Sequence, residues 1–403
     1  MKRFLLSIVV VFMAALAQAQ VVEILCDMGM EDIRSAEVDG NTYVSFENTR
    51  YRGTYTGIGE AVKALVGGYV TGDLNIVATI SDNPELAITI PAELLEGYKS
   101  GKVSLTQIYE KMAISYDVDP LWSELRHKPI DNSASFKVDF VIYPELMVDN
   151  SRFSRLYSYY FNLSPALEVQ LWRGGHFTGQ IVIPVVTNQS GVYERVRMGV
   201  LAISQEFYLG KGFQAKIDAG NFTGNRLGVQ GSVNWSTKSG RLALYAKLGR
   251  TISSEFGSDG LWHITPGGLT NAAITATIYE PKTNLRFDLQ ASKYLYGDIG
   301  VRADCTRYFG EYAVGGFVVC SEGDFNCGFN VAIPLGSKRY MKNNYARIRP
   351  ADYFGLNYSM SSWGDFVDNK LAIGYDVVPN ANRSSDYYQP EYIRYFILKT
   401  ETK

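Results

Sequence analysis

The sequence predicts a mainly β protein in which a transmembrane antiparallel β-barrel of about twelve strands follows a small α+β domain. Three observations predict this fold. They are an export leader, the lack of a later apolar run near the ~18 residues of a membrane helix, and repeated period-two alternation of apolar and polar residues. The expected parts are a signal peptide over 1–19, the α+β domain over 20–130 and the barrel over 131–403.

The leader has the three parts of a secretory signal peptide. Lys2 and Arg3 precede an apolar stretch over 4–16, and Ala17-Gln18-Ala19 supplies the small-x-small pattern of a cleavage site. We therefore expect the mature chain to begin near Gln20, beyond an inner membrane. A chain that crosses lipid without helices can satisfy its backbone hydrogen-bonding groups only as a closed barrel.

Composition agrees with strands and gives no reason to propose nucleic acid as a partner. The chain has 39 Lys and Arg against 41 Asp and Glu, a formal charge of −2, so nothing favours nucleic acid. Its 38 Gly, 28 Tyr and 20 Phe suit tight turns and aromatic girdles. If a hairpin turns near Gly323-Asp324, Cys320 and Cys327 lie opposite each other and could form a disulfide. Free buried thiols are the alternative.

Between residues 20 and 130, helix and strand patterns alternate. Turn-forming residues separate two pairs of strands, and proline, glycine and a capping box mark the helix ends. The expected hairpins are 34–38 with 42–46 and 74–80 with 86–90, and the expected helices are 59–66, 91–101 and one that begins after Ser104. The region is too polar to lie in lipid, so it predicts a soluble domain.

From about Ser133 the period changes to two. In one such segment Leu285, Phe287 and Leu289 alternate with Arg286, Asp288 and Gln290. These segments approach the ~9 to 11 residues of a membrane-spanning strand, whereas strands of a soluble sandwich are nearer five or six. The last expected strand is 392–398. A secreted β-sandwich adhesin remains an alternative, because its strands also carry one apolar face.

The polar face of the expected barrel carries charges of both signs. In one interpretation they interlock as structural ion pairs, because an unpaired charge away from water is costly. In the other they line a hydrated channel and bind the hydroxyl groups of a sugar polymer. The candidate lumen residues are Lys216, Asp218, Arg241, Lys247, Arg286, Asp288, Arg302 and Asp304.

Catalytic chemistry finds little support in the sequence. The only histidines are His127, His176 and His263, and none shows a positioned nucleophile or metal-ligand spacing. Gly297-Asp298-Ile299-Gly300 opens a strand with no helix after it, so it predicts a turn that Asp298 caps and not a dinucleotide-binding loop. We expect no enzyme, metal or cofactor.

Two stretches resemble the YjbH/GfcD-like outer-membrane proteins associated with exopolysaccharide and capsule production. The first is Glu47-Asn48-Thr49-Arg50-Tyr51-Arg52. The second runs from Tyr294 through Gly297, Asp298 and Gly300 to Arg307 and then Ile333-Pro334-Leu335, with a shorter echo at Arg349-Pro350. The resemblance implies a barrel in the outer membrane, a periplasmic N-terminal domain, and a role in polysaccharide export or surface assembly.

The expected partners follow from these interpretations. They are outer-membrane lipid, periplasmic polysaccharide-export proteins and a surface polysaccharide. A second hypothesis from the residues is a structural or anchoring barrel with a plugged lumen. Two interpretations fit Glu47, Asn48, Tyr51 and Arg52. They form either a structural corner between a strand and a helix or a binding site for one of these partners.

Overall fold

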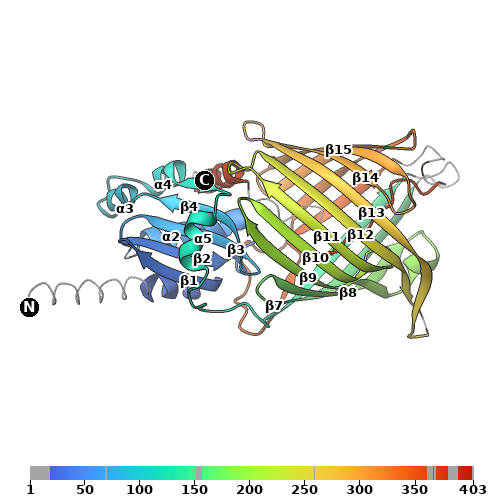
Figure 1. The fold of residues 1–403 in the computed structure, drawn as a ribbon, viewed down its shortest axis with the longest axis horizontal. Coiled ribbons are helices and arrows are strands. Elements are labelled where there is room, and N and C mark those ends of the chain that lie inside the picture. The colour runs from blue at the N-terminus through green and yellow to red at the C-terminus, as the bar shows by residue number, and fades with distance from the viewer. Residues whose placement is uncertain are drawn as a thin grey trace, which may run out of the picture.

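The computed structural model describes residues 19–68, 70–150, 157–257, 259–360, 366, 369–379 and 389–401. The expected signal peptide lies, apart from its last residue, outside the described residues. The described chain forms an N-terminal domain and a β-barrel that lie end to end (Figure 1). Within these residues, no helix combines the length and the apolar character needed to cross a membrane.

The N-terminal domain is a five-stranded sheet with helices packed on it. The strand order is β1-β2-β3-β4-β5, and β2 pairs with β3 in parallel. Both expected hairpins are confirmed, and Ser104 forms the expected capping box with Gln107. The elements are β1 (Glu31–Val38), β2 (Asn41–Glu47), α2 (Thr54–Val66), β3 (Leu74–Ile80), β4 (Asn83–Ile90), α3 (Ala92–Lys99), α4 (Leu105–Lys111), β5 (Ala113–Ser115) and α5 (Asp119–Leu125).

The last element, α7 (Pro390–Glu401), is a helix that packs on this domain against α2 and α4. The strand expected over 392–398 is therefore wrong. Tyr392, Ile393, Phe396 and Ile397 are buried in the domain core, which is the i, i+1, i+4, i+5 pattern of one helix face. Figure 1 shows this helix, in red, beside α4.

The second part is a closed barrel. Thirteen of the described strands form its circumference, one more than the expected number. The strands are β6 (Val138–Asp149), β7 (Ser158–Trp172), β8 (Gly175–Thr187), β9 (Arg197–Gly210), β10 (Phe213–Phe222), β11 (Arg226–Ser236), β12 (Leu242–Phe256), β13 (Trp262–Glu280), β14 (Leu285–Lys293), β15 (Ile299–Phe309), β16 (Tyr312–Ser321), β17 (Asp324–Pro334) and β19 (Tyr353–Ser359), and β18 (Ala346–Pro350) extends the same sheet.

The closing seam explains the odd number. β18 and β19 follow one another along the same edge of β6, and both run parallel to it. The strands from β6 to β17 are joined antiparallel, and β17 pairs with β19. The expectation of a purely antiparallel barrel is therefore wrong at this seam, where the first and last strands start from the same end.

The two ends of the barrel are distinct. The backbone N–H groups of Gly174 and Lys211, in the β7–β8 and β9–β10 turns, donate to Ser81 and Asp119 of the N-terminal domain at 2.7 and 2.8 Å. We call this end the domain-side mouth. The other end, where β6 and β19 finish, is the far mouth.

Apolar side chains cover the outside of the barrel. Leu248 is 61% exposed, Ile274 65% and Leu289 57%, and Leu248 and Leu289 lie on the apolar faces that the alternation predicted. In a β-sandwich these side chains would be buried between two stacked sheets. One closed sheet with its apolar face outward contradicts the β-sandwich alternative.

Part of the connection between β19 and α7 lies inside the barrel. β19 ends at the far mouth, where the Asn150 N–H donates to the Ser359 carbonyl at 3.1 Å, yet α7 lies at the domain side. Of the connection, residues 360, 366, 369–379 and 389 are described. Val377, Val378 and Pro379 line a cavity inside the barrel. We call 369–379 the luminal segment.

All four cysteines, Cys26, Cys305, Cys320 and Cys327, are free. Cys320 pairs with Phe325 in the β16–β17 register, and Cys327 pairs with Val318. The hairpin turns at Glu322-Gly323, one residue before the Gly323-Asp324 turn that would have placed the two thiols opposite each other. The candidate disulfide is therefore not formed.

Candidate functional site

The corner between β2 and α2 is held by Asn48. Its side-chain amide donates to the carbonyls of Tyr51 and Gly53 at 2.9 and 3.2 Å, and its Oδ1 accepts the Tyr51 N–H at 3.0 Å. A side chain that bonds its neighbouring backbone in this way fixes a turn. Asn48 therefore has the role of a structural corner between strand and helix, which was one of the two interpretations of the 47–52 motif.

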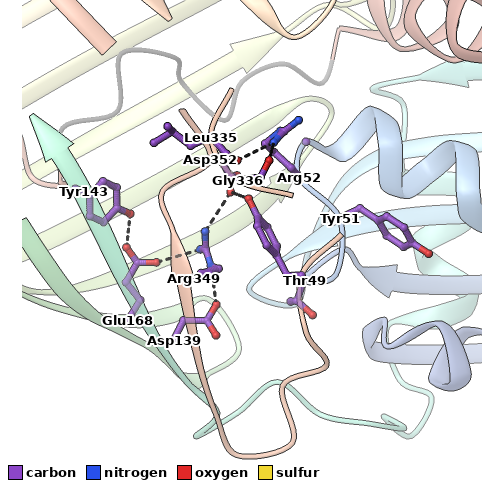
Figure 2. A network of polar contacts seen from close by, with 12 residues as sticks. Thr49, Tyr51, Arg52, Asp139, Tyr143, Glu168, Leu335, Gly336, Arg349 and Asp352 are labelled. Atoms are coloured by element: carbon purple, nitrogen blue, oxygen red, sulfur yellow. Dashed lines mark hydrogen bonds and ion pairs between the residues drawn. The ribbon is translucent and has the colours of Figure 1, made fainter. Parts of the chain in front are cut away.

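Arg52 extends the corner to the barrel. Its Nε and Nη2 donate to Glu311 Oε1, in the β15–β16 turn, at 2.9 and 2.7 Å. Its Nη1 donates to the carbonyls of Leu335 and Gly336 at 2.7 and 2.9 Å (Figure 2). The Arg52 side chain is 5% exposed. Sequence reasoning placed Arg52 in a motif, and the structure makes it a buried connection between the domain and the barrel.

A second polar network surrounds Arg349 inside the domain-side mouth (Figure 2). Arg349 lies 3.1 Å from both Asp139 and Asp352, and 3.6 Å from Glu168. The Tyr143 hydroxyl donates to Glu168 at 2.5 Å. These bonds tie β18 to β6 and β7, so the Arg349 motif position supports the closing seam.

A cavity of about 450 Å³ lies between the N-terminal domain and this network. Glu47 and Tyr51 line its domain wall, and Lys137, His176 and Arg349 line its barrel wall. We call it the junction cavity. It has the size of a ligand pocket, but its lining charges are largely bonded to each other, as Lys137 is to Glu31 at 2.8 Å.

Glu47 is buried at the edge of this cavity. Burial raises the pKa of its carboxyl well above the usual range, and the neighbouring Asp32 and Glu31 carboxylates raise it further. Because the folded state favours the protonated acid, Glu47 stabilises the fold fully below the pKa of an unfolded glutamate. That contribution is lost as pH rises through the folded pKa.

Glu47→Gln should therefore be more stable than the parent at pH 8, with an advantage that shrinks as the pH is lowered toward 4. The glutamine keeps the shape of the protonated acid and removes the ionisation. Urea unfolding at several pH values measures this difference. A Glu47→Gln protein that loses stability equally at every pH would contradict the assignment.

Most of the candidate lumen residues do face inward, as ion pairs within or between neighbouring strands. Lys216 lies 3.1 Å from Glu206 and 3.6 Å from Asp218. Arg286 pairs with Asp288 at 2.9 Å, and Arg302 pairs with Asp304 at 2.7 Å. These contacts match the structural interpretation of interlocking charges. Lys247 lies over the Tyr375 ring of the luminal segment, whereas Arg241 is exposed in the turn before β12.

A larger cavity of about 740 Å³ lies in the domain-side part of the barrel, where Pro84, Glu85 and Tyr116 of the N-terminal domain also line it. We call it the luminal cavity. Neutral polar side chains contribute much of its wall, and sequence reasoning missed them because it selected charges. The sequence pattern nevertheless identifies them, because they alternate in step with Lys216 and Arg286 and so lie on the same inward-facing side of their strands. Members of this set are Gln214, Gln230, Ser232, Asn234, Thr275 and Gln290.

The Gly297–Gly300 motif anchors the luminal segment. Gly297 has a φ of +99°, which favours glycine in this β14–β15 turn. Asp298 Oδ2 accepts from the Ser321 hydroxyl at 2.6 Å and from the Ala372 N–H at 2.8 Å. A Cβ on Gly300 would lie 2.4 Å from the Cys320 carbonyl oxygen. The turn is confirmed, but the Asp298 carboxyl bonds Ser321 and the luminal segment and does not cap its own turn as expected.

The other motif positions lie apart from these networks. Arg307 is exposed near the domain-side mouth, with its guanidinium 5.0 Å from the centre of the Phe309 ring. Pro350 ends β18, close to Gly336. The described residues contain no cluster of three or more His, Cys, Asp or Glu side chains that could hold a metal.

Comparison with protein-family models, with curated proteins and with solved structures finds no match for this chain.

Proposed function

We propose that this protein is an outer-membrane barrel that assists the export or surface assembly of a polysaccharide. The observation that carries the membrane assignment is the closed barrel with its apolar side chains outward and its charges inward. Such a surface suits lipid. The leader and the motif resemblance support the outer membrane and the polysaccharide, and they would place the N-terminal domain in the periplasm.

The polar interior supports a role in handling sugars. The junction and luminal cavities share lining residues, among them Glu206 and Lys216, so they adjoin one another at the domain-side end of the barrel. A polymer delivered by periplasmic export proteins would meet the N-terminal domain first, because that domain covers the domain-side mouth. These partners remain part of the proposal.

Gene deletion followed by a surface-polysaccharide assay tests this role. We expect the amount or the composition of the polysaccharide to change, and complementation with the parent gene to restore it. An unchanged polysaccharide in the deletion strain would contradict the proposed function, even if the protein fractionates with outer membranes.

The second candidate function is a structural or anchoring barrel, and the luminal segment favours it. The Tyr375 ring stacks on Phe222 with centroids 5.3 Å apart and planes at 10°. The Thr223 N–H donates to the Asp376 carbonyl at 3.0 Å. A Cβ on the inward-facing Gly249 would lie 1.9 Å from Tyr375 Oη, so the barrel wall accommodates this ring.

The luminal segment gives a conductance prediction. The parent protein should show little ion conductance in planar bilayers, and Tyr375→Ala with Asp298→Ala should raise it several-fold, because two side-chain anchors of the segment are lost. Ile299→Ala is the matched control, since Ile299 lies next to Asp298 but is 66% exposed on the outside. A parent conductance as large as that of the double variant would contradict a plugged resting state.

A further inference from the structure

The luminal cavity has a wall of hydrogen-bonding groups in register. Gln214 pairs directly with Asn234 across β10 and β11, and Asp218 pairs with Gln230. Side chains of directly paired residues lie about 5 Å apart, and successive inward residues along one strand are about 6.8 Å apart. The wall therefore presents amide and carboxylate groups at regular intervals along the barrel.

Every basic side chain that lines the cavity is already paired with a carboxylate. Its basic lining residues are Lys216 and Arg286, and both are paired. Its acidic lining residues are Glu85, Glu206, Asp218, Asp288, Asp304 and Asp376. A cavity lined by more carboxylates than cations disfavours an anionic ligand.

Two buried acceptors in this wall have no partner among the described residues. They are Asp218 Oδ2 and Gln230 Oε1. The Asp218 side chain is 0% exposed, and Gln230 is 3% exposed. Leaving a buried acceptor unpaired costs about 1–3 kcal/mol, so both atoms select for a ligand that can donate hydrogen bonds.

We propose that the luminal cavity binds an uncharged, polyhydroxylated stretch of a saccharide and excludes one that carries carboxylates. Sugar hydroxyls donate to Asp218 Oδ2 and Gln230 Oε1. The Asn234 amide donates to sugar oxygens, as does the second N–H of the Gln214 amide, whose first N–H donates to Glu85 Oε1 at 2.8 Å. A uronate would place its negative charge beside Asp218. This inference rests on the proposed role in polysaccharide handling and specifies its substrate class.

Titration of the purified protein with two matched sets of probes tests the inference. The first set is neutral gluco-, galacto- and manno-oligosaccharides of six residues, and the second is oligogalacturonate of the same length. Isothermal titration should detect at least one neutral oligosaccharide and no oligogalacturonate. Gln230→Leu should weaken the neutral ligand about tenfold, equal to ~1.4 kcal/mol.

Val229→Ala is the matched control, because Val229 neighbours Gln230 but is 52% exposed on the outer face. Heat-modifiable gel mobility checks that each variant keeps its barrel. Oligogalacturonate binding as tight as the neutral ligand, or no binding by any neutral probe, would overturn the inference. The gene deletion tests the proposed function separately. If the deletion strain loses its polysaccharide while the purified barrel prefers uronates, the proposed function stands and this inference fails.

Discussion

Tyr392→Ala is expected to destabilise the N-terminal domain by about 3–5 kcal/mol, the usual cost of removing a large buried aromatic side chain. Tyr392 is 0% exposed in α7, and its ring lies 6.2 Å from that of Tyr55 and 5.8 Å from that of Tyr308. Its hydroxyl donates to the Gly310 carbonyl of the barrel. Hydrogen–deuterium exchange should therefore show lost protection in α7 and α2.

Tyr395→Ala is the matched control for this prediction. Tyr395 lies three positions along the same helix but is 36% exposed, so its loss should cost less than about 1 kcal/mol. If the segment were instead a barrel strand, Tyr392→Ala would alter the heat-modifiable mobility of the barrel and leave α2 protected. That outcome would contradict the docking of α7 on the domain.

Arg52→Met is expected to weaken the connection between domain and barrel by about 3–5 kcal/mol, because it leaves the charge of Glu311 buried without its main partner. Glu311 is 11% exposed, and Lys338 lies 3.8 Å from it, too far to replace the two Arg52 bonds. Limited proteolysis should then release the N-terminal domain at lower protease concentrations, while the barrel stays resistant.

The double variant Arg52→Met, Glu311→Gln provides the internal control. Replacing both members of a buried ion pair costs much less than removing one, so it should recover much of the resistance to protease. A double variant as sensitive as Arg52→Met alone would show that the Leu335 and Gly336 carbonyls, and not the ion pair, carry the connection.

The local elements of the N-terminal domain could be predicted because short-range chemistry determines them. The turn at Asp39-Gly40 and the capping box at Ser104 each depend on residues within a few positions. α7 could not be predicted in the same way. Its Tyr-Ile-Arg-Tyr-Phe-Ile-Leu stretch fits both a strand and a helix, and packing against α2 and α4 decides between them.

The inward and outward faces of the barrel strands could be predicted from the alternation of apolar and polar residues. The pairing that closes the barrel could not. Alternation assigned Leu289 to the outside and Asp288 to the inside without any knowledge of pairing. The parallel seam between β6 and β19 joins residues some two hundred positions apart, and no local pattern encodes that pairing. The expected count of about twelve strands is therefore close to the thirteen observed, and one below it.

The candidate site was only partly predictable for a similar reason. The charged lumen residues follow from parity, and the motif resemblance identified Arg52, Asp298 and Arg349 as positions of interest. Their roles depend on distant partners: Arg52 bonds Glu311 across 259 positions, and Asp298 bonds Ala372 across 74. The luminal segment itself carries neither a strand nor a helix pattern. Its contacts depend on the inner wall of the folded barrel, so the sequence alone does not predict them.

The most direct test of a membrane-spanning barrel is a lipid-exposure measurement along β14. Single cysteines at Leu289 and Gln290, in a variant without the four native cysteines, can carry a fluorophore that nitroxide-labelled lipids quench. We predict strong quenching at Leu289 and weak quenching at Gln290, and the same contrast between Val301 and Arg302 on β15. Equal quenching at neighbouring positions, or none at Leu289 and Val301, would contradict a barrel whose apolar face contacts lipid.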